Sequence, residues 1–364
     1  MNGTATTENV ALSAVGSASA RGSRPSQQDR HLVLTPDKLP SGVGKDIALF
    51  AVFDGQYAPP SLTHSNPNSL QLTQRSGSEI VAEHALQHIP NSLFDSPGFR
   101  EGDYERAMQS AIDQEDKALF KGFHDGEMRF STAGSTVTLA LVDFVKRTLL
   151  VGNLGDSHAM LAERDPGSAE ITNVTRLTED HKPDKPDEKE RIEDAGGTVH
   201  AQKSVARIGA LNMSRSLGDL EYKQPLNNMD SGPVTDEQKL AILGTDKSAE
   251  QRGSFLSIEL SFKKTELAND KQYLLALTSD GVTNCMEDKV IMHSLSHLLK
   301  SGQSVEEAAR SMVDETTSNT GSDNATCIVV LISGAQVQEK GDGESSANGP
   351  QGGDAEGEVG LGRC

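Results

Sequence analysis

The sequence lacks most features that would place it in a specialised class of protein. Its three cysteines, Cys285, Cys327 and Cys364, are widely spaced and form no CxxC pair, so neither a disulfide framework nor a zinc site is indicated. No apolar run approaches the roughly 20 residues that a membrane helix needs. A phosphate-binding P-loop, a serine hydrolase elbow and a dinucleotide-binding glycine fingerprint are also missing.

Basic charge is scarce as well. The net charge of −19 argues against nucleic acid or an anionic membrane as a main partner. The N-terminus has no basic start and no continuous apolar core, which a secretory signal would show, and its first arginine is Arg21. We therefore expect an intracellular monomer in the cytoplasm or nucleus, with a mitochondrial location left open.

Apolar segments recur through most of the chain without a long linker, which predicts one large domain over residues 10–335. Residues 1–9 are expected to be a flexible N-terminus. The acidic stretch 336–364 has too little apolar surface to bury a core and is expected to be disordered. The polar stretches 56–75 and 223–254 are interpreted as insertions in the domain.

The hydrophobic patterns predict an α+β domain, because strands and helices do not alternate regularly. The turn "NLGDS", which contains Asp156, is interpreted as a hairpin. Strands are predicted at Val10–Ser19, His31–Thr35, Ile47–Phe53, Ser135–Asp143, Thr148–Leu154, His158–Glu163, Phe255–Phe262 and Tyr273–Thr278. Helices are predicted at Ser76–Ile89, Tyr104–Phe120, Pro186–Ala195, Glu287–Lys300 and Ser304–Ser318.

Three aspartates lie at the ends of predicted buried strands. Asp54 and Asp280 follow apolar runs and are each followed by glycine, and Asp323 precedes the apolar run that starts at Thr326. Carboxylates at strand ends can converge on one rim of a sheet, where they provide the hard oxygen ligands that Mg²⁺ or Mn²⁺ prefers. The alternative is that these aspartates only cap turns, as most strand-end aspartates do.

The motifs follow one another in a recognisable order. They are "RPSQQDR" (24–30), "FDG" (53–55), "AGST" (133–136), "NLGDSHAML" (153–161), "HKPDKPDEKERIEDAGG" (181–197), "SRSLGD" (214–219), "TSDG" (278–281) and "GSDNATCIVV" (321–330). This series resembles the protein phosphatase 2C (PPM) family of metal-dependent serine/threonine phosphatases. The resemblance implies a four-layer αββα sandwich, in which two antiparallel β-sheets are flanked by helix pairs, and phosphoproteins as substrates.

The resemblance also implies a metal site. It places one divalent ion on Asp54, Asp280 and Asp323, and a second on Asp54, the Gly55 carbonyl and the residue at position 28. Two Mg²⁺ or Mn²⁺ ions would lower the pKa of a bridging water and neutralise the phosphoryl oxygens. The family usually has glutamate where this chain has Gln28, so the second ion is expected to bind more weakly.

Further roles follow from the same resemblance. Arg24 matches the arginine that holds the substrate phosphate, a task that suits a forked guanidinium. Asp29 would orient metal-bound waters. Asp156 and Asp280 would help to hold a third, looser ion, but Asn284 stands where the family often has aspartate, which puts that site in doubt.

Gln56 is the most consequential departure from the family pattern. The family usually has histidine there, understood to act as the general acid for the leaving oxygen, and glutamine cannot deliver a proton. Its absence is expected to slow turnover of alkyl phosphates. Three functions therefore stay open: a phosphoserine/phosphothreonine phosphatase of reduced activity, a pseudophosphatase that binds phosphoproteins, and a phosphoesterase for a small metabolite.

Two histidine features receive structural interpretations. His181, in "EDHKPD", matches a position of the family, and a structural hydrogen bond is at least as good an interpretation of it. His293 and His297 have the i, i+4 spacing of a two-histidine metal site, but no third ligand accompanies them in "HSLSH", so ordinary helix positions are favoured.

Overall fold

The computed structural model describes residues 10–44, 46–57, 79–127, 132–165, 170–226 and 252–334. The strands are β1 Ala11–Ala20, β2 Arg30–Leu34, β3 Ile47–Phe53, β4 Gly55–Tyr57, β5 Ala133–Ser135, β6 Val137–Asp143, β7 Thr148–Leu154, β8 His158–Arg164, β9 Ile171–Arg176, β10 His200–Gln202, β11 Val205–Arg207, β12 Leu217–Gly218, β13 Ser261–Glu266, β14 Gln272–Thr278 and β15 Ala325–Ser333. The helices are α2 Ile80–Asp95, α3 Pro97–Glu101, α4 Tyr104–His124, α5 Pro186–Asp194, the 3₁₀ turn Leu220–Tyr222, α7 Asp280–Thr283, α8 Asp288–Lys300 and α9 Val305–Thr317.

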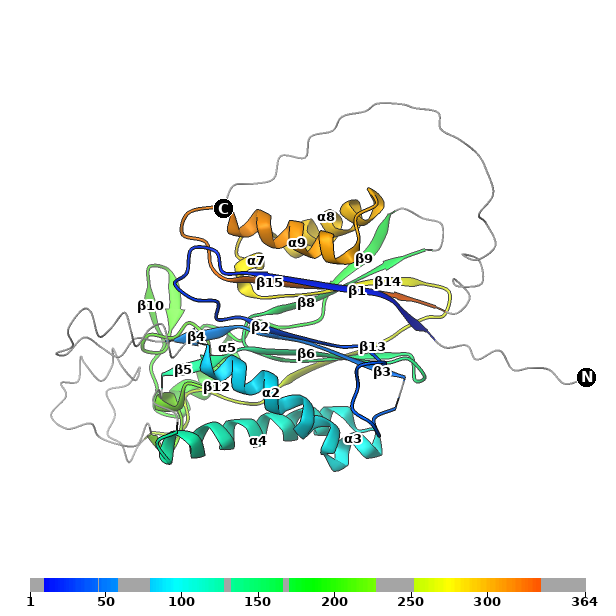
Figure 1. The fold of residues 1–364 in the computed structure, drawn as a ribbon. Helices are drawn as coiled ribbons and strands as arrows, with labels where there is room; N and C mark the ends of the chain where they lie inside the picture. Colours follow the sequence, from blue (N-terminus) through cyan, green and yellow to red (C-terminus); the bar gives the residue numbers. More distant parts are fainter. Residues whose placement is uncertain are drawn as a thin grey trace, which may run out of the picture.

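The domain is built of four layers, as Figure 1 shows. One sheet has the strand order β1-β15-β14-β8-β9 and the other has the order β13-β7-β6-β3-β2, with antiparallel pairing throughout. Helices α8 and α9 cover the first sheet, and α2 and α4 cover the second. The predicted αββα sandwich is confirmed.

Strand β3 shows why the sequence produces these layers. All seven of its residues are buried, so it forms a continuous apolar run instead of alternating with polar residues. Alternate side chains point to opposite faces. Leu49 and Phe53 pack toward α2 and α4, whereas Phe50 and Val52 pack in the core between the two sheets.

Most helix boundaries follow local signals, but α4, which was predicted to end at Phe120, continues to His124. The capping box of Ser304 and Glu307 opens α9, as the sequence predicts. Helix α2 was expected to end at Ile89, but it continues through Pro90 to Asp95. Leu93 and Phe94 are buried in the last turn, and this packing outweighs the cost of a proline inside a helix.

Two strand predictions are wrong. The "NLGDS" segment is not a hairpin, because β7 lies in one sheet with β6 and β13 while β8 lies in the other sheet. The strand predicted at Phe255–Phe262 begins only at Ser261. Phe255 and Leu256 instead pack with Ile192 of α5 and Tyr222 in a separate small core. In both cases tertiary contacts determine the local structure, and the local sequence pattern does not.

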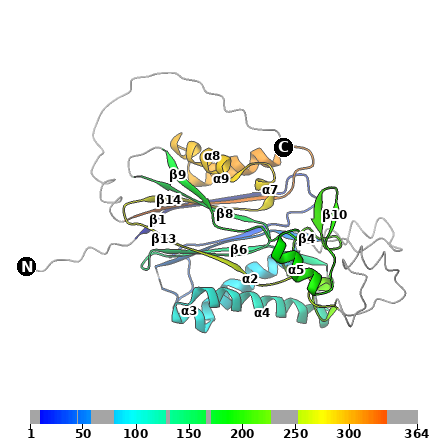
Figure 2. The same ribbon diagram turned by 180° about the vertical axis from the view of Figure 1, so that it is seen from behind.

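Smaller elements gather at one end of the sandwich. The three-stranded sheet β12-β5-β4, the hairpin β10-β11 and helix α5 lie there, as Figure 2 shows from behind. Residues 1–9 and 336–364, and most of 56–75 and 223–254, lie outside the described residues. Among the described residues, no helix combines the length and the hydropathy that crossing a membrane requires.

Candidate active site

Asp54 lies at the junction of the large and small sheets. It directly follows β3, and Gly55 begins β4, which pairs with β5. Thr136 fixes the junction from both sides: its backbone N–H donates to the Asp54 carbonyl at 2.9 Å, and its hydroxyl accepts from the Asp54 N–H at 3.1 Å. The Asp54 backbone is therefore held rigidly at the end of the buried strand.

Asn324 positions the loop that carries Arg24 and Gln28. Its side-chain oxygen accepts from the Gln28 N–H at 2.7 Å, and its amide nitrogen donates to the carbonyls of Arg21 and Ser26 at 2.7 and 3.0 Å. A residue in the turn before β15 thus orders a loop almost 300 positions earlier in the chain. The motif "GSDNAT" gave this residue no role in the sequence analysis.

Asp29 is buried just behind this loop. The hydroxyls of Ser279 and Thr326 each donate to its Oδ2 atom at 2.8 Å, whereas its Oδ1 atom has no hydrogen-bond partner. Burial is the main cause that raises the pKa of Asp29 to about 6. An unsatisfied buried carboxylate oxygen is costly, so a donor or cation is needed on that side.

Asp280 and Asp323 come from neighbouring strands of the first sheet. Asp280 follows β14 and receives a 3.1 Å hydrogen bond from the Asn284 amide. Its neighbour Gly281 must be glycine, because a Cβ atom there would lie 1.8 Å from the Asn324 carbonyl oxygen. Asp323 is paired with the guanidinium of Arg24. Arg24 therefore supplies the positive charge next to this carboxylate.

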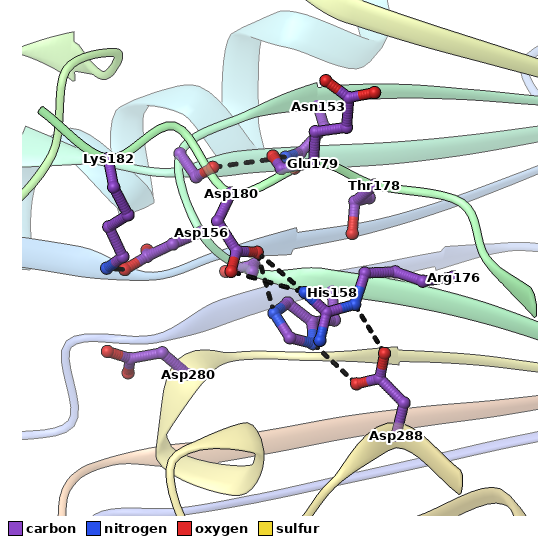
Figure 3. A network of polar contacts seen from close by, with 12 residues as sticks. Asn153, Asp156, His158, Arg176, Thr178, Glu179, Asp180, Lys182, Asp280 and Asp288 are labelled. Atoms are coloured by element: carbon purple, nitrogen blue, oxygen red, sulfur yellow. Dashed lines mark hydrogen bonds and ion pairs between the residues drawn. The ribbon is translucent and has the colours of Figure 1, made fainter. Parts of the chain in front are cut away.

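Asp156 lies in the crossover between β7 and β8 and lines the same cavity as Asp280 and Asp323. It is buried and forms an ion pair with Lys182, a residue that the sequence analysis did not single out (Figure 3). His181 supports the crossover, because its Nδ1 atom accepts a 3.0 Å hydrogen bond from the Gly155 N–H. Burial, followed by the charge of Arg215, lowers the pKa of His181 to about 4, so the ring is neutral. The expected structural role fits this geometry.

A second network lies beside Lys182 and anchors the same segment to α8. Figure 3 shows the His158 ring between Asp180 and Asp288, at 3.0 and 2.9 Å, with Arg176 contacting both carboxylates. Burial raises the pKa of Asp288, but hydrogen bonds from His158 and Arg176 outweigh it and hold the pKa at about 2. The network therefore contains an ionised Asp288 throughout the ordinary pH range.

Gln56 lies in β4 and points to the "SRSLGD" motif. Its Nε2 atom donates a 2.6 Å hydrogen bond to Oδ2 of Asp219, which also accepts from Ser216 at 2.7 Å. Burial is the main cause that raises the pKa of Asp219 to about 7. Gly134 leaves the room for this carboxylate, because a Cβ atom there would lie 1.9 Å from Asp219 Oδ2.

The candidate residues meet in one cavity of about 520 Å³. Asp29 lies behind its wall, and His293 and His297 lie elsewhere, on the exposed face of α8. The cavity is also lined by the loop that follows β11, which no sequence motif indicated. The predicted residues that line it are Arg24, Gln28, Asp54, Gly55, Gln56, Asp156, Asp280, Asn284 and Asp323.

The electrostatics of this cavity fit divalent cations. Burial, followed by the charge of Asp156, raises the pKa of Asp280 to about 7. Burial and the charges of Asp29 and Asp280 raise the pKa of Asp54 well above its usual value. Carboxylates that oppose one another's ionisation, together with the unpaired Oδ1 atom of Asp29, form a hard oxygen donor set of the kind that Mg²⁺ and Mn²⁺ prefer.

Comparisons with known proteins agree with this arrangement. A family model described as protein phosphatase 2C matches residues 13–325. The "Probable protein phosphatase 2C 5" of Paramecium tetraurelia is 31% identical over 325 residues, covering 86% of this chain and 90% of that protein. The "Protein phosphatase 2C homolog 2" of Schizosaccharomyces pombe is 26% identical over 335 residues, covering 89% of this chain and 74% of that protein.

Solved structures of protein phosphatases share this fold. A serine-threonine phosphatase 2C from Toxoplasma gondii has a TM-score of 0.62 at 18% identity, covering 89% of this chain and 97% of that structure. The chain belongs to the protein phosphatase 2C family of protein serine/threonine phosphatases. Members of this family generally depend on Mg²⁺ or Mn²⁺ and act on phosphoproteins.

Proposed function

We propose that this protein hydrolyses phosphoserine and phosphothreonine in proteins with the help of Mg²⁺ or Mn²⁺, and that its turnover of alkyl phosphates is slow. The observation that carries the proposal is the convergence of Asp54, Asp156, Asp280 and Asp323 in one cavity with Arg24. When bound, the cations supply an activated water and neutralise the phosphoryl oxygens. The domain responsible is proposed to span residues 10–335.

The cations would be held in two places. Asp54, Asp280 and Asp323 would hold the first ion, and Gln28, Asp54 and the Gly55 carbonyl would hold the second. Gln28 offers an oxygen without a formal charge, so the second ion binds more weakly than it would beside glutamate. Asp156 sits next to Asp280 but is neutralised by Lys182, which reduces what it can offer to a third ion.

Arg24 and Asp29 would serve the substrate and the water. Arg24 is half exposed at the cavity, so its guanidinium can exchange Asp323 for a phosphate once a cation neutralises that carboxylate. Asp29 is buried and tightly held by Ser279 and Thr326. Its unpaired Oδ1 atom would help to orient metal-bound waters, as the resemblance to the family implies.

Gln56 would slow the departure of the leaving group. It lines the cavity, but its amide carries no acidic proton and its Nε2 atom is committed to Asp219. An alkoxide leaving group must then take its proton from water, which forfeits the benefit of about 10²–10⁴ that a general acid provides.

A phosphopeptide assay in Mn²⁺, with and without EDTA, tests this proposal. We expect slow turnover that EDTA removes. Phosphopeptide binding without any turnover, at saturating Mn²⁺, would instead identify a pseudophosphatase that retains the fold for recognition. Turnover of small phosphate esters but of no phosphopeptide would indicate a metabolite phosphoesterase. We propose a monomer as the active species.

A further inference from the structure

A second group of metal-ligating side chains lies in the helical layer that covers the second sheet. His84 and His88 are one turn apart on α2, and Glu115 faces them from α4. One ligand atom from each of the three residues lies within 4.8 Å of the others. In the described part of the chain, no other three histidine, cysteine or acidic side chains come this close.

Glu115 is in an unusual position for a carboxylate. Its side chain is 1% exposed, on the face of α4 that also buries Ala111, Ile112 and Leu119. Burying a charge among apolar side chains is costly unless a cation or strong hydrogen bonds compensate for it. The hydrogen bond that compensates for the burial of Glu115 comes from His84, whose Nδ1 atom lies 2.6 Å from Glu115 Oε1. A cation bound next to the Glu115 carboxylate would therefore stabilise it.

The two imidazoles lie side by side on one face of α2. Their rings stack with centroids 3.9 Å apart and planes inclined by 22°. The Nδ1–H of His88 donates to the His84 carbonyl oxygen at 2.8 Å, which fixes its tautomer and leaves the lone pair of Nε2 free. A backbone carbonyl bound to the other ring nitrogen is the usual support of a metal-binding histidine.

We propose that His84, His88 and Glu115 form a site for Zn²⁺, separate from the phosphatase cavity, that ties α2 to α4. Two imidazoles and one carboxylate from two helices match the donor set of a three-ligand zinc site with an open fourth position. Imidazole favours a borderline cation over Mg²⁺. His88 is exposed and His84 half-buried, so an ion and a water can enter from solvent.

The site would act on the fold close to the cavity. Glu115 is followed by Asp116, which accepts hydrogen bonds from the Gly218 N–H at 3.0 Å and from Lys223 Nζ at 2.6 Å. These contacts hold the segment that carries Asp219, the partner of Gln56. A cation that fixes α4 against α2 would therefore make the segment around Asp219 more rigid. It would not itself lie in the phosphatase cavity.

The chain contains its own control for the histidine spacing. His293 and His297 on α8 have the same i, i+4 spacing and are both exposed, but no third ligand accompanies them among the described residues. If helical spacing alone were enough, both pairs would bind Zn²⁺. If the buried carboxylate is needed, only the α2 pair does.

Calorimetric titration of the full-length protein with Zn²⁺ in excess Mg²⁺ tests the proposal, because Mg²⁺ competes for the oxygen-rich cavity. We expect one Zn²⁺ site in the wild type, at least about tenfold weaker binding in His88→Gln and in Glu115→Gln, and no change in the double variant His293→Gln/His297→Gln. His88 is exposed, so His88→Gln tests the site even if Glu115→Gln fails to fold. Zn²⁺ should also slow amide hydrogen exchange in α2 of the wild type and not of His88→Gln.

Two results would overturn the proposal. The first is a Zn²⁺ affinity that is the same in His88→Gln as in the wild type, which would leave His84 and Glu115 as an ion pair only. The second is an equal loss of affinity in the α8 double variant, which would mean that Zn²⁺ binds exposed histidines without selection. Substituting Co²⁺ for Zn²⁺ gives an independent readout, because intense visible absorption marks four-coordinate binding in the wild type and should be lost in His88→Gln.

Discussion

Gln56 donates a 2.6 Å hydrogen bond to the buried carboxyl group of Asp219. The two residues come from motifs more than 160 positions apart. Gln56 lines the cavity where the candidate ligands meet, and Asp219 is buried next to Gln56. Asp219 has its pKa raised to about 7 by burial, so it gains from any donor placed at position 56. A protonated imidazole there would favour the ionised form of Asp219, and the paired carboxylate would in turn keep the imidazole protonated.

Gln56→His is therefore predicted to raise phosphoserine peptide turnover by about tenfold or more. An aryl phosphate releases a stabilised phenolate and needs little protonation, so turnover of p-nitrophenyl phosphate should change much less. Steady-state kinetics on both substrates at saturating Mn²⁺ gives the comparison. Equal effects on the two substrates would show that proton delivery is not what Gln56 limits.

Gln28→Glu is predicted to strengthen the weaker of the two metal-binding steps, because it adds a formal negative charge to a hard-cation site. A calorimetric Mn²⁺ titration should show a tighter second step and an unchanged first one. Asn324 should keep the loop in place in this variant, since it binds the backbone N–H of residue 28 and not its side chain. An unaltered titration curve would count against a ligand role for Gln28.

Asn324→Ala is predicted to lower the free energy of unfolding by about 1–3 kcal/mol, because it leaves polar backbone groups of the 21–28 loop without partners. The loop carries Arg24, so KM for a phosphopeptide should rise together with the loss of stability. Urea denaturation and kinetics measured on the same preparation test both effects. A destabilised variant with wild-type KM would separate the loop from substrate binding.

Asp288 is predicted to make stability depend on pH in the acid range. Its pKa in the folded protein is about 2 against an ordinary value of 3.8. The stabilisation is therefore complete above pH 3.8 and disappears as the pH falls toward 2. Its size should be about 1–2 kcal/mol after allowance for solvent screening.

Asp288→Asn should lower the free energy of unfolding at about pH 6 and match the wild type near the acid end. Chemical denaturation across this range measures the difference. If the gap between the two proteins were independent of pH, the ion pairs of Asp288 with His158 and Arg176 would not be its cause.

The sequence predicts the fold well where burial on both faces leaves a continuous apolar run, as in β3, or where a local signal such as the Ser304/Glu307 capping box marks a boundary. It fails where distant contacts decide. The pattern around "NLGDS" suits a hairpin, but the chain crosses between sheets there because β8 finds its partners in β14 and β9. Helix α2 passes Pro90 because Leu93 and Phe94 are buried beyond it.

The candidate site likewise contains residues that the sequence predicts and residues whose partners it does not predict. The aspartates could be predicted because each follows or precedes a buried strand and sits in a recognisable motif. Lys182, Asp219 and Asn324 could not be assigned their partners, because those partners are 26, 163 and 296 or more positions away. The pair His84/His88 was as visible in the sequence as His293/His297. What distinguishes the α2 pair is the nearby Glu115, which the sequence does not reveal because it belongs to a different helix, α4.

The most direct test of the central claim is the thermal stability and calorimetric Mn²⁺ binding of Asp280→Asn beside the wild type. Asp54, Asp280 and Asp323 repel one another unless a cation lies among them, so Mn²⁺ should stabilise the wild type strongly. The variant should bind Mn²⁺ at least about tenfold more weakly and should lose most of the metal-induced rise in Tm. Mn²⁺ binding and a Tm increase equal to those of the wild type would contradict the metal site.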